Sequence, residues 1–148
     1  MQLETGGRTA KKGKKMNRNT LTGLVVIAIA LIGIILYSFN RPSRIESVGA
    51  DRVEELLKSE NVFVLQAHNP YQGELDGTDL ILEDWQNIAR YEDQLPADKD
   101  VPILVYCRSG RMSAMAAKQL ADMRYSKIYD FDGGMKAWTA SGRELVFR

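Results

Sequence analysis

The chain has 148 residues, 45% hydrophobic and 26% charged, which fits one globular domain with a short additional segment. Its net charge of +1 is unevenly spread: residues 1–20 carry six basic side chains and one acidic, whereas residues 41–148 carry 14 basic and 18 acidic. The acidic main part argues against a nucleic-acid-binding domain, and the single cysteine, Cys107, excludes an internal disulfide and a CxxC zinc site.

Residues 1–20 form a basic tail, and residues 21–39 follow as a run of 19 residues without a charged side chain. At ~1.5 Å per helical residue this run nearly covers the ~30 Å bilayer core, so we expect a transmembrane helix at 21–39. No small-residue cleavage site follows it, which favours an uncleaved anchor in the lipid bilayer over a signal peptide. The basic residues before the span predict a single-pass protein with a cytoplasmic N-terminus and an extracytoplasmic domain. A start at Met16 would leave only Arg18 before the span and remove this charge argument.

Pro42 and Ser43 interrupt helix formation, so we expect a linker at 40–43 and a folded domain at 44–148. We predict strands at 45–48, 62–65, 80–82, 103–106 and 128–131, and helices at 51–58, 85–95, 113–123 and 135–141. The inner face of the third of these helices is expected to carry Met115, Ala116, Leu120 and Met123. Apolar strands that alternate with helices predict an α/β fold with a parallel sheet covered on both faces.

Cys107 stands where the apolar strand 103–106 enters a short loop and then a helix. In parallel α/β sheets ligands bind beyond the carboxyl ends of the strands, which places Cys107 at the expected binding edge. Backbone N–H groups of a tight loop and a helix N-terminus favour negative charge, and a thiol in such a place ionises readily to the nucleophilic thiolate. Gly110 suits the positive φ of a tight loop, and Ser113 suits the N-cap of the helix.

Three segments resemble the rhodanese (sulfurtransferase) family. The most specific are residues 105–113, VYCRSGRMS, and residues 133–138, GGMKAW, which is close to the family's glycine-glycine-x-x-x-tryptophan ending. A weaker match is residues 73–78, GELDGT, to the family's Gly-His-Ile-Pro-Gly-Ala. The resemblance covers residues 44–148 and implies a single rhodanese-like domain, preceded here by the transmembrane helix.

The resemblance implies that Cys107 takes sulfane sulfur from a small-molecule donor such as thiosulfate, carries it as a persulfide, and passes it to cyanide, a thiol or a protein acceptor. It implies no cofactor and no metal. Arg111 resembles a basic loop position that binds anionic donors. The expected substrate-binding residues are Arg108, Ser109, Gly110, Arg111, Met112 and Ser113. Because the chain has no second cysteine, the sulfur must leave to another molecule.

The chain departs from the family at residues 66–70, QAHNP, where relatives read Asp-x-Arg-x-Pro. His68, the only histidine, falls at a strand end on the same edge as Cys107. It is an auxiliary candidate, either as an imidazolium partner of the thiol or, the interpretation we favour, as a hydrogen-bonded replacement for the structural arginine. Asp130 and Asp132 are interpreted as turn residues.

Two other functions compete with sulfur transfer. Phosphatases of this fold use a Cys-x5-Arg loop, but the sixth residue after Cys107 is Ser113, and Arg111 comes at the fourth position. A non-catalytic binding or sensing domain would fit the missing Asp and Arg of the family pattern. Such a domain would have no need of a thiol in a cationic loop.

Overall fold

The computed structural model describes residues 17–39, 41–59 and 61–148. The chain divides into two units, one that contains helix α1 and one that comprises residues 41–148. Most of the expected basic tail, and residue 40 of the expected linker, lie outside the described residues.

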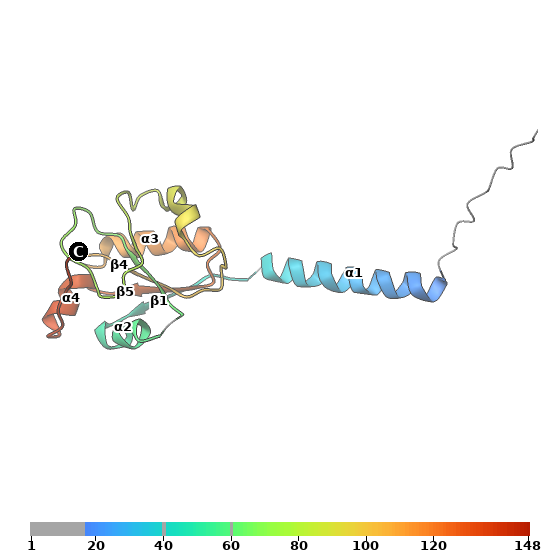
Figure 1. Ribbon diagram of the computed structural model, residues 1–148, viewed down its shortest axis with the longest axis horizontal. Helices are drawn as coiled ribbons and strands as arrows, with labels where there is room; N and C mark the ends of the chain where they lie inside the picture. Colours follow the sequence, from blue (N-terminus) through green and yellow to red (C-terminus); the bar gives the residue numbers. More distant parts are fainter. Residues whose placement is uncertain (1–16, 40, 60) are drawn as a thin grey trace, which may run out of the picture. The chain divides into compact units, whose positions relative to one another are not determined.

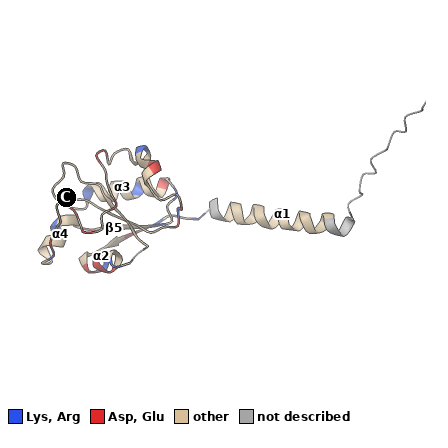
Figure 2. Cartoon of the chain, viewed as in Figure 1, with Lys and Arg blue, Asp and Glu red and all other residues tan. Residues whose placement is uncertain are grey.

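Helix α1 extends over Arg18–Phe39, so the helix expected in this region is present. Its described side chains are uncharged (Figure 2), and its large apolar residues from Leu21 to Tyr37 are 49–69% exposed. Among the described residues, however, no helix combines the length and the apolarity that crossing a membrane requires. The expected transmembrane character of residues 21–39 is therefore not supported by the structure.

Residues 41–148 fold around a five-stranded sheet in the order β1-β5-β4-β2-β3, and every neighbouring pair is parallel. The parallel pairing confirms the α/β prediction. The central strand β4 is buried at all four residues because it has neighbours on both sides and helices on both faces. The strands are β1 (Arg44–Val48), β2 (Phe63–Gln66), β3 (Leu80–Ile81), β4 (Ile103–Tyr106) and β5 (Lys127–Phe131).

Helices cover both faces of the sheet (Figure 1). Helices α2 (Ala50–Leu57) and α4 (Gly134–Ala140) pack on one face, and α3 (Arg111–Asp122) packs on the other with the 3-10 helix η1 (Ile88–Gln94). Side chains of a strand alternate between the two faces. Val105 and Cys107 consequently join the core beneath α3, and Tyr106 joins the core beneath α2 and α4.

Two helices differ from the prediction. The segment 85–95 is a short 3-10 helix that begins only at Ile88, because Asp84 accepts the backbone N–H groups of Gln86 and Asn87 in a turn. Helix α3 begins at Arg111, two residues before the predicted start. Met115, which we expected inside, is 47% exposed, since it lies on the far side of the buried stripe. That stripe consists of Ser113, Ala116, Ala117 and Leu120.

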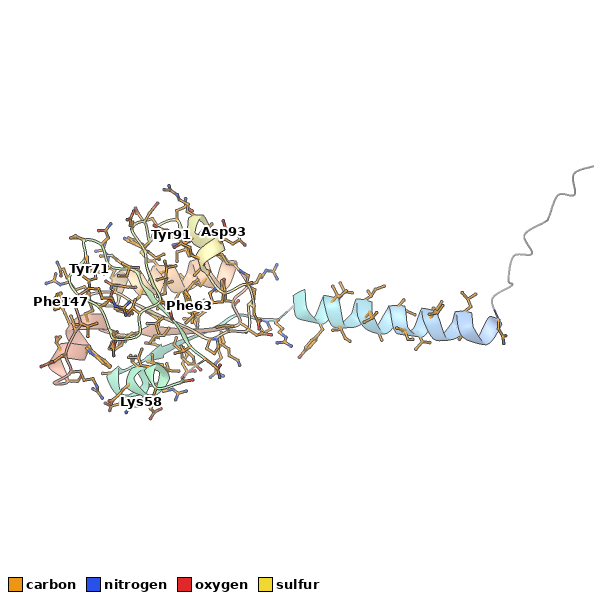
Figure 3. All side chains as sticks on the ribbon, viewed as in Figure 1. Lys58, Phe63, Tyr71, Tyr91, Asp93 and Phe147 are labelled. Atoms are coloured by element: carbon orange, nitrogen blue, oxygen red, sulfur yellow. The ribbon has the colours of Figure 1, made fainter. Side chains whose placement is uncertain are left out.

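The C-terminal segment lies along the loop that follows β2. Glu74 and Val146 form an isolated antiparallel bridge, with N–H···O distances of 2.9 and 2.8 Å. The rings of Tyr71 and Phe147, labelled in Figure 3, meet edge to face with their centroids 6.5 Å apart. Arg148 Nε lies 2.7 Å from Oε1 of the buried Glu74, so the two side chains form an ion pair. Their geometry is not that of a hydrogen bond. These contacts hold the loop against the domain.

Candidate active site

Cys107 directly follows β4, and its side chain is only 1% exposed. The backbone N–H of Gly110 donates to Cys107 Sγ at 3.1 Å. Gly110 has φ 89° and ψ −20° and is the N-cap residue of α3. A residue with a Cβ rarely adopts this conformation, so the glycine lets the loop fold back until a backbone donor points at the sulfur. The positive φ expected at Gly110 is confirmed.

The N-terminus of α3 adds positive potential beside the sulfur. Its first intrahelical bond runs from Ala114 N–H to the carbonyl oxygen of Gly110 at 3.1 Å, so the preceding N–H groups have no partner within the helix. Arg108, Ser109 and Arg111 are exposed, and Met112 is half-buried. The loop therefore places one backbone donor, the Gly110 N–H, and the N-terminus of α3 beside a buried thiol, and carries its two arginines on the surface.

Ser113 does not cap α3 as expected. It is fully buried, and its Oγ donates to the carbonyl oxygen of Gly110 at 3.0 Å. Asp130, expected in a turn, is instead a residue of β5 and is partly buried. Burial raises the pKa of Asp130, the Ser113 hydroxyl opposes this by hydrogen bonding to the carboxylate, and the charge of Asp132 adds to the increase.

The glycine-glycine motif packs directly on the active loop. The N–H groups of Met135 and Lys136 donate to the carbonyl oxygens of Cys107 and Arg108, at 2.9 and 3.0 Å. Gly134 has φ 54°, and a Cβ there would overlap the carbonyl oxygen of Cys107. The two segments that carried the strongest resemblance in the sequence are thus one unit in space.

His68 lies two residues beyond β2, the strand beside β4. Ala67 N–H donates to the Tyr106 carbonyl oxygen at 2.7 Å, so the segments that follow β2 and β4 still run side by side as they leave the sheet. The imidazole is 5% exposed, and neither ring nitrogen has a hydrogen-bond partner among the described residues. The structure thus shows no protein partner for the hydrogen-bonding role that we favoured, and both this role and that of an imidazolium partner of Cys107 stay predictions.

Sequence reasoning missed a buried polar cluster around Tyr106. The Tyr106 hydroxyl accepts the Leu75 N–H at 3.0 Å and Gln66 Nε2 at 3.2 Å, and lies 2.7 Å from Thr78 Oγ1. Burial is the main cause that raises the pKa of Tyr106 to about 12, so the hydroxyl stays protonated. This cluster ties β4 to the loop 73–78. The one signal for it was a tyrosine that ends an otherwise aliphatic strand.

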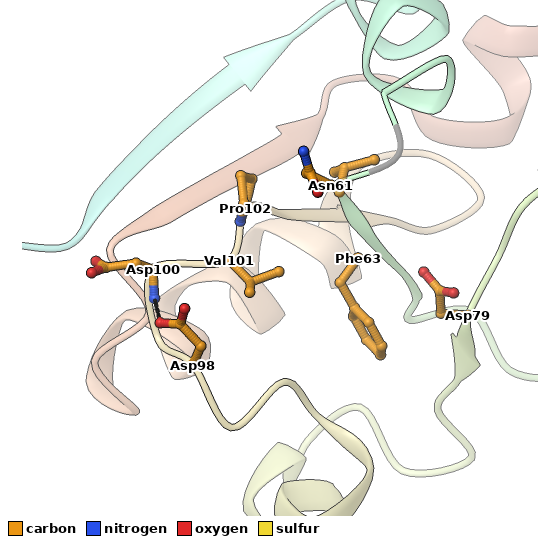
Figure 4. Close-up of a pocket in the computed structure, with 8 residues that line it drawn as sticks. Asn61, Phe63, Asp79, Asp98, Asp100, Val101 and Pro102 are labelled. Carbon is orange, nitrogen blue, oxygen red and sulfur yellow. Dashed lines mark hydrogen bonds between the residues drawn. The ribbon is translucent and has the colours of Figure 1, made fainter.

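A hollow opens at the amino edge of the sheet, opposite the edge that carries Cys107 (Figure 4). Its volume is about 530 Å³. It is lined by Asn61, Val62, Phe63, Asp79, Asp98, Asp100, Val101 and Pro102. Each of the three carboxylates already accepts a hydrogen bond, from Val64 N–H, Asp100 N–H and Arg41 respectively. Within the described part of the chain, no group of three or more His, Cys, Asp or Glu side chains could hold a metal ion. We therefore take the edge that carries Cys107 as the candidate active site.

Comparisons with known proteins agree with this choice. The family profile described as a rhodanese-like domain matches residues 49–141. The chain is similar to the thiosulfate sulfurtransferase GlpE of Pseudoalteromonas translucida, with 33% identity over 97 residues that cover 64% of this chain and 89% of that protein. It is also 36% identical over 53 residues to a sulfurtransferase of Allochromatium vinosum, covering 36% of this chain and 48% of that protein.

Solved structures share the fold. A rhodanese-related protein from Thermoplasma volcanium superposes with a TM-score of 0.58 at 24% identity, over 70% of this chain and 99% of that one. A protein of Rhodopseudomonas palustris described as a possible tyrosine phosphatase has a TM-score of 0.58 at 19% identity, over 93% of this chain and 100% of that one. Identities this low establish a common fold and leave the chemistry to the site itself.

Proposed function

Because the chain belongs to the rhodanese-like family, we propose that it is a sulfurtransferase in which Cys107 carries the sulfur as a persulfide. The observation that carries this proposal is the Gly110 N–H donated to Cys107 Sγ at 3.1 Å, at the N-terminus of α3. A backbone donor and a helix dipole favour an anionic sulfur over a neutral thiol. The similarity to a relative named thiosulfate sulfurtransferase supports thiosulfate as a donor.

The reaction proceeds in two displacements. The Cys107 thiolate attacks the outer sulfur of thiosulfate, a new S–S bond forms, and sulfite leaves with the electron pair of the broken S–S bond. An acceptor thiolate or cyanide then attacks the terminal sulfur of the persulfide, and the Cys107 thiolate is the leaving group. The negative charge lies on Cys107 Sγ in the thiolate and on the outer sulfur in the persulfide, so an anionic sulfur lies near the N-terminus of α3 before and after each step. Arg108 and Arg111, exposed on the loop, attract an anionic donor.

Intact-mass measurement of the full chain tests the proposal. Exposure to thiosulfate should add the mass of one sulfur atom, and cyanide should remove it with formation of thiocyanate. Cys107→Ser is the matched control, because the chain has no other cysteine and the variant differs by one atom. Sulfur uptake by Cys107→Ser, or none by the unaltered chain, would refute the assignment.

Phosphate-ester hydrolysis is the less favoured alternative. The place of the phosphate-binding arginine is taken by Ser113, which is buried and bound to the Gly110 carbonyl. Turnover of an aryl phosphate without turnover of thiosulfate would reverse our preference. Absence of both activities, with Cys107 unreactive, would favour the non-catalytic binding domain.

We further propose that residues 21–39 attach the domain to a membrane, with the N-terminus cytoplasmic and the domain on the other side. The support is a run of 19 uncharged residues whose large apolar side chains are 49–69% exposed along α1. The full chain should stay in the membrane pellet after alkaline carbonate extraction, whereas a chain lacking residues 21–39 should be released. Added protease should digest the domain only from the extracytoplasmic side. Release of the full chain would refute the anchor, and digestion from the cytoplasmic side would refute the orientation.

A further inference from the structure

Lys136 brings a third positive side chain to the active loop, beside those of Arg108 and Arg111. Its backbone N–H donates to the Arg108 carbonyl oxygen at 3.0 Å, and the N–H of Met135 donates to the Cys107 carbonyl oxygen at 2.9 Å. The side chains of Arg108, Arg111 and Lys136 are all exposed. Two segments far apart in the chain thus carry three cations beside the buried thiol, and we call these three residues the cationic rim.

The rim has no counter-ion of its own. Arg108, Arg111 and Lys136 form no ion pair with any carboxylate in the described part of the chain. Elsewhere in the domain the arginines with a carboxylate partner are Arg41, Arg44, Arg52, Arg90, Arg143 and Arg148. Residues 41–148 carry 18 acidic and 14 basic side chains, so the positive charge of the rim is a local feature of an acidic domain. Unpaired exposed charge of this kind attracts a ligand of the opposite sign.

One carboxylate opposes the rim from the same side. The Gly110 N–H donates to Cys107 Sγ at 3.1 Å, and Asp132 Oδ1 lies 3.7 Å from the position that a Cβ on Gly110 would occupy. Asp132 is exposed, and it forms no ion pair with the described cations. Its negative charge therefore acts on whatever approaches the sulfur and counteracts that of the rim.

The second displacement brings two negative charges together. The acceptor thiol loses its proton to solvent, its thiolate bonds to the outer sulfur of the persulfide, and the electron pair of the broken S–S bond stays on Cys107. Positive charge at the rim offsets the repulsion between thiolate and persulfide, and offsets more of it for a more anionic acceptor. We propose that Lys136 and Asp132 are specificity-determining residues of opposite effect, and that the rim selects an acceptor thiol that also carries carboxylate groups. The inference rests on the proposed role of Cys107 as the sulfur carrier.

Four acceptor thiols of graded charge test the proposal on the full chain after thiosulfate has loaded it with sulfur. As thiolates, cysteamine has no net charge, 2-mercaptoethanol has one negative charge, 3-mercaptopropionate has two and mercaptosuccinate has three. The rate of sulfur removal is measured with each thiol at low salt and divided by the fraction of that thiol present as thiolate. The ratio of the rate of a variant to that of the unaltered chain then cancels the intrinsic reactivity of each thiol.

Lys136→Met should slow sulfur removal most for mercaptosuccinate and least for cysteamine. The expected change is about twofold for each unit of acceptor charge, the effect of one charge roughly 10 Å away in water. Asp132→Asn should show the opposite trend, and Lys136→Arg should match the unaltered chain. Lys127→Met is the matched control, because Lys127 is an exposed lysine at the amino end of β5, and it should show no trend. Salt at ~1 M should remove the trends, since it shortens the screening length to ~3 Å.

A loss in Lys136→Met that is equal for all four thiols would overturn the proposal, because it would indicate altered structure rather than altered charge. An equal trend in Lys127→Met would overturn it as well, since the charge of the whole domain would then decide.

Alkylation of Cys107 by anionic iodoacetate and by uncharged iodoacetamide makes the same comparison without a sulfur donor. Lys136→Met should lower the ratio of the iodoacetate rate to the iodoacetamide rate, and Asp132→Asn should raise it. Unchanged ratios would contradict the role of the rim. A chain that shows both changes but takes up no sulfur would contradict the proposed function alone.

Discussion

Replacing Gly134 by alanine tests the contact between the glycine-glycine motif and the active loop. An alanine Cβ would overlap the carbonyl oxygen of Cys107 and stand 2.9 Å from its carbonyl carbon and 3.0 Å from that of Arg108. These neighbours are backbone atoms, so no change of rotamer can relieve the overlap. The segment at Gly134 and the loop at Cys107 must move apart, which also weakens the hydrogen bond from Met135 N–H to the Cys107 carbonyl.

Three contributions set the size of the effect. A residue with a Cβ at φ 54° costs roughly 1–2 kcal/mol. Overpacking of a close contact costs about 1–3 kcal/mol, and each weakened hydrogen bond about 0.5–1.5 kcal/mol. We therefore expect Gly134→Ala to lower the free energy of unfolding by about 3–5 kcal/mol, a large part of the ~5–15 kcal/mol typical of a domain.

Gly142→Ala is the matched control. Gly142 has φ 83°, and a Cβ there meets no atom within 4 Å, so only the backbone contribution of about 1–2 kcal/mol applies. Urea unfolding followed by tryptophan fluorescence measures both variants, and iodoacetamide reports the Cys107 loop. Gly134→Ala should lose more stability than Gly142→Ala and change the alkylation rate. Equal losses in the two variants would refute the close contact.

Three further predictions concern stability. Tyr106→Phe leaves a buried backbone N–H unpaired and should lower the free energy of unfolding in urea by about 1–3 kcal/mol; an unchanged midpoint would contradict the buried cluster. Arg148→Ala leaves the buried Glu74 carboxylate without its ion pair and should lower the melting temperature, and Glu74→Gln in the same chain should restore much of the loss; additive losses would contradict the pairing. Lys58 is the main cause that holds the pKa of Glu54 at about 2, below the ordinary 4.5, so ionised Glu54 stabilises the fold above pH 4.5 and this contribution is lost as the pH falls through about 2. The melting temperature of Glu54→Gln should therefore lie below that of the unaltered chain at neutral pH and meet it near pH 2, and a difference independent of pH would contradict the assignment.

Strand β4 and its cysteine were predictable because local information was sufficient. The run 103–106 is aliphatic up to its final tyrosine, as a central parallel strand requires, and its predicted limits match the observed ones. The residues that follow it contain the glycine that a tight loop needs, and Gly110 has the expected positive φ. The segment 85–95 was predicted less well, since the Asp84 carboxylate accepts the Gln86 N–H and this bond competes with an α-helix there.

The sequence by itself thus determined the order of strands and helices, the edge of the sheet that carries Cys107, and the turn at Gly110. These depend on periodicity and on backbone preferences, which act over a few residues. Only the tertiary structure decided that Ser113 binds the Gly110 carbonyl rather than capping α3, that Gly134 lies against the Cys107 carbonyl, and that the His68 ring has no hydrogen-bond partner among the described residues. These features depend on sheet register and on where a helix begins, and the Gly134 contact joins segments far apart in the chain that no local pattern relates.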